Sequence, residues 1–152
     1  MLLLKSDNIL EHLSNLIHKD TQQNDSQIDL TVNEIHQITK AGSLDFGGSE
    51  FEPVQSVLLK PEKQNPEDDY GWWKLSKGTY RAFFNETLDN PKDITSLISL
   101  HDHAQDAGLI SSTVMITEPG KVGRISMNFH VPEAGCNIKE NARLAMLHML
   151  KE

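Results

Sequence analysis

Two histidines flank an aspartate in the string Leu100-His101-Asp102-His103. Because side chains alternate along a strand, both imidazoles would point to the same side if this segment were extended. Two imidazoles and a carboxylate are ligands that zinc and similar ions accept, so His101 and His103 form a candidate metal pair. The spacing identifies no further ligand, and solvated histidines at a polar strand end explain the same residues.

Two carboxylates could take part in catalysis. Glu118 opens the turn Glu118-Pro119-Gly120, where it could act as a general base or orient a water in a neighbouring pocket. Turns also favour acidic residues for conformational reasons, so the turn alone leaves both interpretations open. Asp29 lies between Ile28 and Leu30, a pattern that an exposed strand face explains without any function.

Composition excludes several classes of protein. The 152 residues predict one domain, and 14 basic against 22 acidic side chains give a net charge of −8. That charge argues against nonspecific binding to nucleic acids or anionic membranes, which requires a positive face. The single cysteine, Cys136, is consistent with a reducing cytoplasm, and no apolar run approaches the roughly 20 residues of a membrane span. We therefore expect a cytoplasmic protein with neither a nucleic-acid nor a membrane partner.

The elements that would position these groups are mostly strands. Residues 6–19 are predicted to form an amphipathic helix, because their apolar residues recur at the spacing of one helical face. From residue 27 onward, short apolar runs alternate with turn residues, which indicates an all-β sandwich or barrel. The predicted boundaries are a single domain over 1–152, with the N-terminal helix in 1–20 and the β core in 27–150. The predicted strands include 28–38, 54–60, 80–86, 94–100, 112–116 and 123–131, with one or two helical turns in 101–108.

Five short stretches, taken in order, resemble the trimeric dUTPase and dCTP deaminase superfamily, and especially its archaeal-type dUTPase branch. They are Asp29-Leu30-Thr31-Val32; Leu44-Asp45-Phe46 with Ser49-Glu50; Lys77-Gly78-Thr79-Tyr80 with Phe84-Asn85-Glu86 and Pro91; Glu118-Pro119-Gly120-Lys121-Val122-Gly123; and Asn141-Ala142-Arg143-Leu144-Ala145-Met146-Leu147. The resemblance implies a distorted jelly-roll, the dUTPase-like β-clip, assembled as a homotrimer with active sites between subunits. It also implies a deoxynucleotide substrate. Family members either hydrolyse Mg²⁺-bound dUTP to dUMP and pyrophosphate or deaminate dCTP.

The departures from the family pattern fall where the chemistry is expected. The Arg-Ser-Ser that contacts the phosphates corresponds to His101, Asp102 and His103 here. A carboxylate 4 Å from a phosphate charge costs about 4 kcal/mol at an effective dielectric of 20. In the hairpin, the family's Asp and Tyr correspond to Glu118 and Lys121. The serine and glutamate that deamination requires would fall at Asp102 and Asn128, so deamination is not expected.

Two functions remain open from the sequence, which does not decide whether the protein is an enzyme. The first is a hydrolase of nucleotide metabolism with altered substrate or metal use, a dUTP-type nucleotide diphosphatase. The second is a pseudoenzyme: a dUTPase-fold trimer with a binding or regulatory role. For the first, Asp29 and Glu118 are the catalytic candidates, and Mg²⁺ is the expected cofactor, with another divalent ion at His101 and His103 as the alternative. The substrate-binding candidates are His101, Asp102, His103, Gly120, Lys121 and Gly123.

Overall fold

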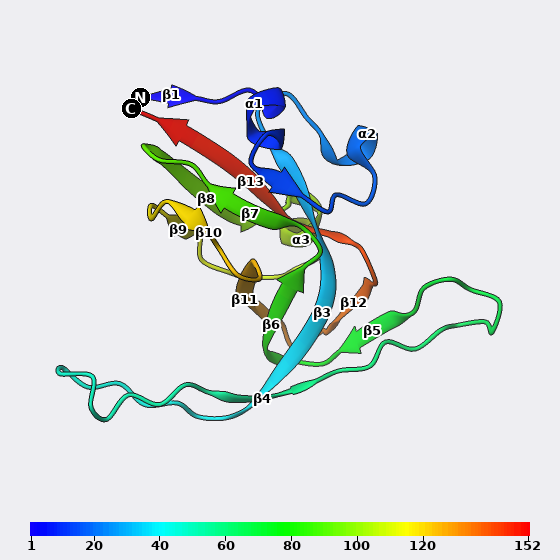
Figure 1. The fold of residues 1–152 in the computed structure, drawn as a ribbon. Helices are drawn as coiled ribbons and strands as arrows, with labels where there is room; N and C mark the ends of the chain where they lie inside the picture. Colours follow the sequence, from blue (N-terminus) through cyan, green and yellow to red (C-terminus); the bar gives the residue numbers. More distant parts are fainter.

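The computed structural model describes residues 1–152 and contains thirteen strands and three short helices (Figure 1). In chain order they are β1 (Leu2–Leu3), α1 (Ser6–Leu10), β2 (Leu13–Ser14), α2 (Lys19–Gln22), β3 (Ile28–Lys40), β4 (Gln55–Leu58), β5 (Trp72–Leu75), β6 (Gly78–Phe84), β7 (Thr87–Asn90), β8 (Ile94–Leu100), α3 (Asp102–Asp106), β9 (Val114–Ile116), β10 (Gly120–Lys121), β11 (Ser126–Val131), β12 (Cys136–Lys139) and β13 (Arg143–Lys151). The expected all-β architecture is confirmed.

The main sheet is antiparallel, with the strand order β11-β6-β3-β13-β8-β9. The long strand β3 pairs with β6 and β4 in one part of its length and with β13 in another, so it joins the two halves of the sheet. Two small sheets, β10-β7-β2 and β12-β5, complete the barrel-like body. None of the helices has the length and apolar character needed to traverse a lipid bilayer.

Strand alternation determines which side chains enter the core. In β6, Tyr80, Ala82 and Phe84 are buried, while Arg81 and Phe83 lie on the outer face. The same alternation runs through β8, whose bounds match the predicted strand 94–100. The inward residues join one core cluster of 26 side chains, and burial of this apolar surface is the main force that holds the sheet together.

The N-terminal helix prediction is wrong beyond Leu10. The helix α1 ends there, and Leu13 enters β2, where it pairs with Leu88 of β7. Asn15 follows with a φ of 68°, a left-handed conformation that cannot continue a right-handed helix. The apolar spacing of residues 6–19 therefore reflects several separate contacts with the core and not one helical face.

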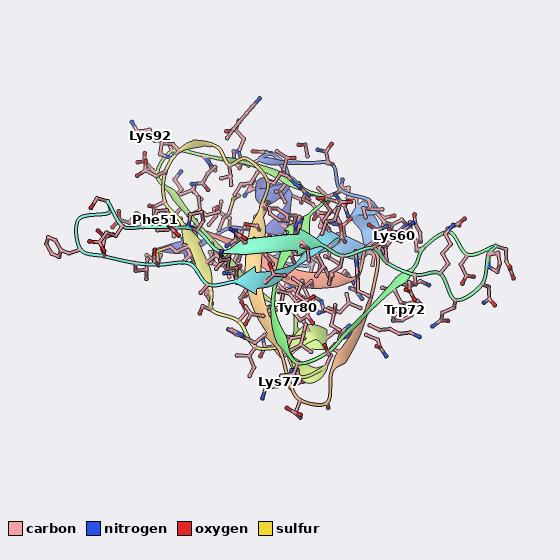
Figure 2. All side chains as sticks on the ribbon, turned by 90° about the horizontal axis from the view of Figure 1, so that it is seen from below. Phe51, Lys60, Trp72, Lys77, Tyr80 and Lys92 are labelled. Atoms are coloured by element: carbon pink, nitrogen blue, oxygen red, sulfur yellow. The ribbon has the colours of Figure 1, made fainter.

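Two long excursions leave the body on opposite sides (Figure 1). One connects β3 to β4 through residues 41–54, and the other connects β4 to β5 through residues 59–71. Figure 2 shows Phe51 on the first excursion and Lys60 and Trp72 at the base of the second. All four residues of β4, Gln55–Leu58, are exposed.

Candidate functional site

Asp29 is a buried carboxylate, with none of its surface exposed, so its interpretation as part of an exposed strand face is wrong. Its Oδ2 atom lies 3.1 Å from Nη1 of Arg143 and 3.3 Å from Nε2 of His101. Its Oδ1 atom accepts a hydrogen bond of 3.1 Å from Gln27. This enclosure compensates the charge of Asp29 within the chain and leaves no exposed carboxylate oxygen at this position.

His101 belongs to the same network, and its geometry differs from the predicted strand. It is the N-cap of α3, where its Nδ1 accepts a hydrogen bond from the backbone N–H of His103 at 3.0 Å. Its Nε2 faces Asp29, so both ring nitrogens have partners within the chain. The imidazole of His103 is exposed, and its centroid lies 4.8 Å from that of His101.

The proposed metal pair gains no further ligand from the fold. No group of three or more His, Cys, Asp or Glu side chains is arranged to hold a metal ion. The assumption that His101 and His103 alternate along a strand is also incorrect, because α3 begins between them. Their metal-binding role therefore stays a prediction.

The hairpin around residues 118–123 is anchored by a buried amide. Asn90, at the end of β7, donates a 3.0 Å hydrogen bond to the carbonyl oxygen of Glu118, and its own Oδ1 accepts one from Ser96. Gly120 has a φ of 114°, which favours glycine, and the β10 strand pairs with β7. The side chains of Glu118 and Lys121 are exposed. The hairpin is thus anchored to β7, while its carboxylate and ammonium groups face solvent.

A second buried carboxylate, Glu86, ties the N-terminal segment to β3. It accepts hydrogen bonds from the backbone N–H and the hydroxyl of Thr31, at 2.8 and 2.6 Å, and from Gln22 at 2.9 Å. Burial raises the pKa of Glu86, and these hydrogen bonds oppose the rise. The donors come from α2 and β3, so Glu86 joins segments that are far apart in the sequence.

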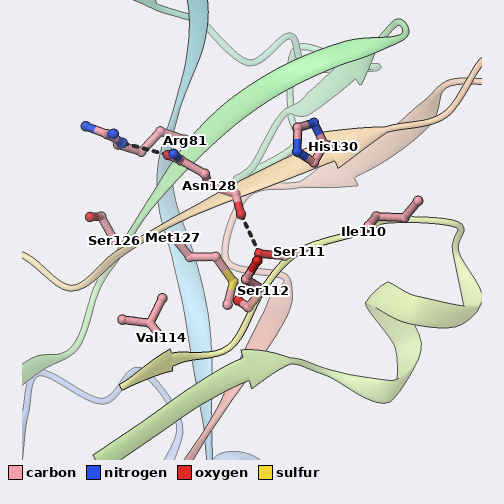
Figure 3. Close-up of a pocket in the computed structure, with 9 residues that line it drawn as sticks. All are labelled: Arg81, Ile110, Ser111, Ser112, Val114, Ser126, Met127, Asn128 and His130. Carbon is pink, nitrogen blue, oxygen red and sulfur yellow. Dashed lines mark hydrogen bonds between the residues drawn. The ribbon is translucent and has the colours of Figure 1, made fainter. Parts of the chain in front are cut away.

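A hollow lies elsewhere, on the outer face of β6 and β11 (Figure 3). It has a volume of about 700 Å³. The sheet register places Arg81 opposite Asn128, and the Nε atom of Arg81 donates a 2.8 Å hydrogen bond to the amide oxygen of Asn128. Ser111 closes one side by donating its hydroxyl hydrogen to the backbone carbonyl of Asn128. The residues that line this hollow are Arg81, Ile110, Ser111, Ser112, Val114, Ser126, Met127, Asn128 and His130.

The lining of this hollow is rich in hydrogen-bond donors and contains no carboxylate. A guanidinium, three serine hydroxyls and an amide suit a ligand that presents oxygen acceptors, such as a phosphate or a pyrimidine carbonyl. The segment that carries Ser111 and Ser112 follows α3 directly and is held to β11 by the reciprocal backbone hydrogen bonds between Ile110 and His130. The lining thus suits a polar ligand, and it includes one imidazole, that of His130, whose Nδ1 atom lies 2.8 Å from the hydroxyl oxygen of Thr79.

None of the predicted site residues lines this hollow. The fold brings Asp29 and His101 together, whereas neither a hydrogen bond nor an ion pair connects Glu118 to Asp29. Among the lining residues, the resemblance gives a place in the family's site only to Asn128, that of the deaminase glutamate. The available signal for Arg81 was the scarcity of arginine in the chain, which has only three.

Comparison with proteins of known structure identifies the class of fold. The 2′-deoxycytidine 5′-triphosphate deaminase from Agrobacterium tumefaciens superimposes with a TM-score of 0.66 at 11% identity, over 99% of this chain. This chain spans about half of that protein, 48% of its length, and at this identity the likeness establishes the fold alone. No protein-family model matches the sequence.

Sequence relatives identify the family to which the chain belongs. A probable deoxyuridine 5′-triphosphate nucleotidohydrolase from Methanosarcina acetivorans is 30% identical over 136 residues, which cover 89% of this chain and 75% of the relative. The protein of the same description from Methanosarcina mazei is 29% identical over an equal length. The chain therefore belongs to the deoxyuridine 5′-triphosphate nucleotidohydrolase (dUTPase) family.

Proposed function

We propose that this protein binds a deoxynucleotide and that its hydrolysis of dUTP by the usual residues of the family is impaired. The observation that carries the proposal is the start of α3. There, where the resemblance expects Arg-Ser-Ser on the phosphates, the exposed carboxylate of Asp102 stands beside a His101 whose ring is already engaged with Asp29. The segment at which the family neutralises phosphate charge thus carries a negative charge instead.

The donor-rich hollow supports the binding half of the proposal. Arg81, Asn128 and the neighbouring serines offer donors to nucleotide oxygens, and the segment that carries Ser111 and Ser112 continues directly from α3. The resemblance places active sites between subunits, so residues of a second copy would complete the site around the ligand. We further propose that the protein acts in the cytoplasm as a homotrimer, without nucleic-acid or membrane partners.

A hydrolase with altered substrate or metal use is the second candidate. Glu118 favours it, because this hairpin carboxylate is exposed and makes no side-chain hydrogen bond or ion pair. The chain alone offers no cage for Mg²⁺, but Mg²⁺ commonly reaches such sites on the substrate phosphates and needs only one or two protein carboxylates. In that case Glu118 would hold or orient the attacking water, Gly120 and Gly123 would present backbone groups to the base, and Lys121 would contact a phosphate.

Calorimetric titration with dUMP and with a non-hydrolysable dUTP analogue, with and without Mg²⁺, tests the binding proposal. We expect binding that weakens in Arg81→Ala and not in Lys63→Ala, a control on the remote excursion 59–71. Absence of binding by the wild-type chain to any deoxynucleotide would refute the proposal.

Pyrophosphate release from a panel of deoxynucleoside triphosphates, with Mg²⁺, Mn²⁺ or Zn²⁺, tests the impairment. We expect near-background pyrophosphate release. The variant Asp102→Ser should bind the triphosphate analogue about tenfold more tightly, because the substitution removes a carboxylate that repels the phosphates. The gain is limited to about this size because solvent screens the charge of an exposed carboxylate. Asp106→Ser, at the other end of α3, is the matched control. Efficient dUTP turnover that Glu118→Gln abolishes would instead establish the hydrolase.

A further inference from the structure

The segment 15–27 between β2 and β3, here called the strap, is attached to the body through one buried side chain. Gln22 is 1% exposed and is the only buried residue of the strap. Leu16 is partly buried against the core, whereas Ile17 is 46% exposed. Figure 1 shows α2, which lies within the strap, at the periphery of the barrel-like body. Burial of apolar surface, which holds the sheet together, therefore contributes little to the attachment of the strap.

The amide of Gln22 uses every hydrogen-bonding position it has. Its Oε1 atom accepts the backbone N–H groups of Ile17 and His18, at 2.9 and 2.8 Å, within the strap. Its Nε2 atom donates to the backbone carbonyl of Asp29 and to Oε2 of Glu86, both at 2.9 Å, in the body. A primary amide has two acceptor and two donor positions, so all four are occupied. One side chain thus joins the strap to β3 and to the turn between β6 and β7.

The strap also covers the carboxylate of Asp29. Nε2 of Gln27 donates to Oδ1 at 3.1 Å, and Nδ2 of Asn24 donates to Oδ2 at 3.3 Å. The partners of this carboxylate outside the strap, Arg143 and His101, both reach Oδ2. The hydrogen bond that Oδ1 accepts therefore comes from the strap, whereas Oδ2 is held mainly by the body.

The other side-chain contacts of the strap are mostly at the surface. Asp25 pairs with Lys5 in solvent, and Gln23 donates to Ser6 and Asp7 of α1. The helix α2 has four residues, far fewer than the roughly 12–15 that an isolated helix needs in water. A segment with so few buried apolar contacts opens at a lower free energy than the sheet beneath it.

We propose that the strap is a lid, latched by Gln22, which opens while the sheet remains folded and thereby frees Oδ1 of Asp29. In the open form Oδ2 stays with Arg143 and His101, which belong to the body. Oδ1 then faces solvent as an acceptor for a cation or a hydrogen-bond donor. The structure shows the closed form, in which no ligand can reach the carboxylate. The strap thus controls access to Asp29, a role that goes beyond the proposed function.

Native-state hydrogen exchange of the wild-type chain tests the opening. The amides of Gln23 and Asn24 donate to carbonyl oxygens within the strap, at 2.8 and 3.0 Å, so their protection depends on the strap being in place. We expect their protection factors to be at least about tenfold lower than those of residues 96–98 in β8, and insensitive to low urea, because a local opening exposes little surface. Equal protection in the strap and in β8 would overturn the proposal, because the strap would then open only with the whole fold.

Carboxylate labelling with a carbodiimide and glycine ethyl ester, mapped by mass spectrometry, tests what the strap covers. Gln22→Met keeps the length of the side chain and removes its four hydrogen bonds, so the open form should become about tenfold more populated. Labelling of Asp29 should rise by the same factor. Gln23→Met, the same substitution at the next position, removes only the bonds to Ser6 and Asp7 and should leave the labelling of Asp29 unchanged.

Circular dichroism verifies that both variants keep the fold. Labelling of Asp29 that rises equally in the two variants, or that does not rise in a folded Gln22→Met, contradicts the lid. If Gln22→Met does not fold, hydrogen exchange of the wild-type chain decides the proposal by itself. Neither measurement uses a nucleotide, so the lid and the proposed function stand or fall separately.

Discussion

Replacing Arg143 with methionine should destabilise the protein far more than removing an ordinary surface cation. Arg143 is the guanidinium partner of Asp29, whose carboxylate is completely buried. Leaving a buried charge without its partner costs about 3–5 kcal/mol when both groups are enclosed. The Arg143 side chain is 35% exposed, so solvent screens part of the interaction, and His101 and Gln27 remain on the carboxylate. We therefore expect a loss of about 2 kcal/mol in the free energy of unfolding.

Urea unfolding at fixed protein concentration measures this loss, because any assembly makes apparent stability depend on concentration. Thermal unfolding gives a second measure. For a chain of this size, a loss of 1 kcal/mol in the free energy of unfolding lowers Tm by about 2–4 °C, so we expect Arg143→Met to lower Tm by about 4–8 °C. Lys5→Met is the control, since Lys5 pairs with Asp25 in solvent with 66% and 83% of the two side chains exposed. That pair should contribute no more than about 1 kcal/mol.

A double-mutant cycle with Asp29→Asn isolates the pair. The double variant should lose less stability than the sum of the losses in the two single variants. The reason is that, with asparagine at position 29, removal of Arg143 no longer leaves a buried negative charge without its partner. Equal losses in Arg143→Met and Lys5→Met, or additive losses in the cycle, would refute the argument that Arg143 compensates a buried carboxylate.

Three further measurements address the other buried polar groups. Asn90→Ala should cost about 1–3 kcal/mol by stranding buried hydrogen-bond partners, and hydrogen exchange in residues 116–123 should accelerate; unchanged exchange there would contradict the anchoring role. Burial raises the pKa of Glu86, so the native state binds the carboxyl proton more tightly than the unfolded state does. The free energy of unfolding of the wild type, relative to that of Glu86→Gln, should therefore fall as the pH rises from the ordinary glutamate range to the raised pKa. A difference in urea midpoint between the two proteins that does not change with pH would contradict this prediction. Burial lowers the pKa of His148 while Asp29 raises it, so Asp29→Asn should lower the His148 pKa further in an NMR titration, and an upward shift would exclude this coupling.

Local patterns predicted the strands because alternation is a local property. The strand β8 follows directly from the alternating residues 94–100, and the outward direction of Arg81 follows from its place in β6. The helix over residues 6–19 failed for a related reason. Leu13 fits a helical spacing, but its pairing partner Leu88 lies 75 residues later, and no local pattern indicates that pairing.

The candidate site was less predictable because its contacts are long-range. Asp29 between two apolar neighbours looks like an exposed strand residue until Arg143, 114 positions away, is placed against it. The hollow depends on the register that sets Arg81 opposite Asn128, and nothing local to either residue encodes that register. Sequence reasoning therefore found the turn that carries Glu118 but not the cavity on the sheet.

The motifs that carry the family resemblance meet in the interior, so the fold itself constrains the residues at those positions. Three pairs link the first, third and last of these motifs: Asp29 with Arg143, Thr31 with Glu86, and Asn85 with Asn141, whose side chains lie 2.9 Å apart. Each pair provides hydrogen-bond partners for polar groups in the interior, and a buried polar group without a partner costs about 1–3 kcal/mol of stability. Loss of one partner therefore destabilises the fold whether or not the protein has a substrate. Asp102 and His103, by contrast, are exposed, and their identity is free of that constraint. The resemblance in these three motifs is therefore evidence for the architecture, and the reaction has to be inferred from the hollow, the hairpin and the start of α3.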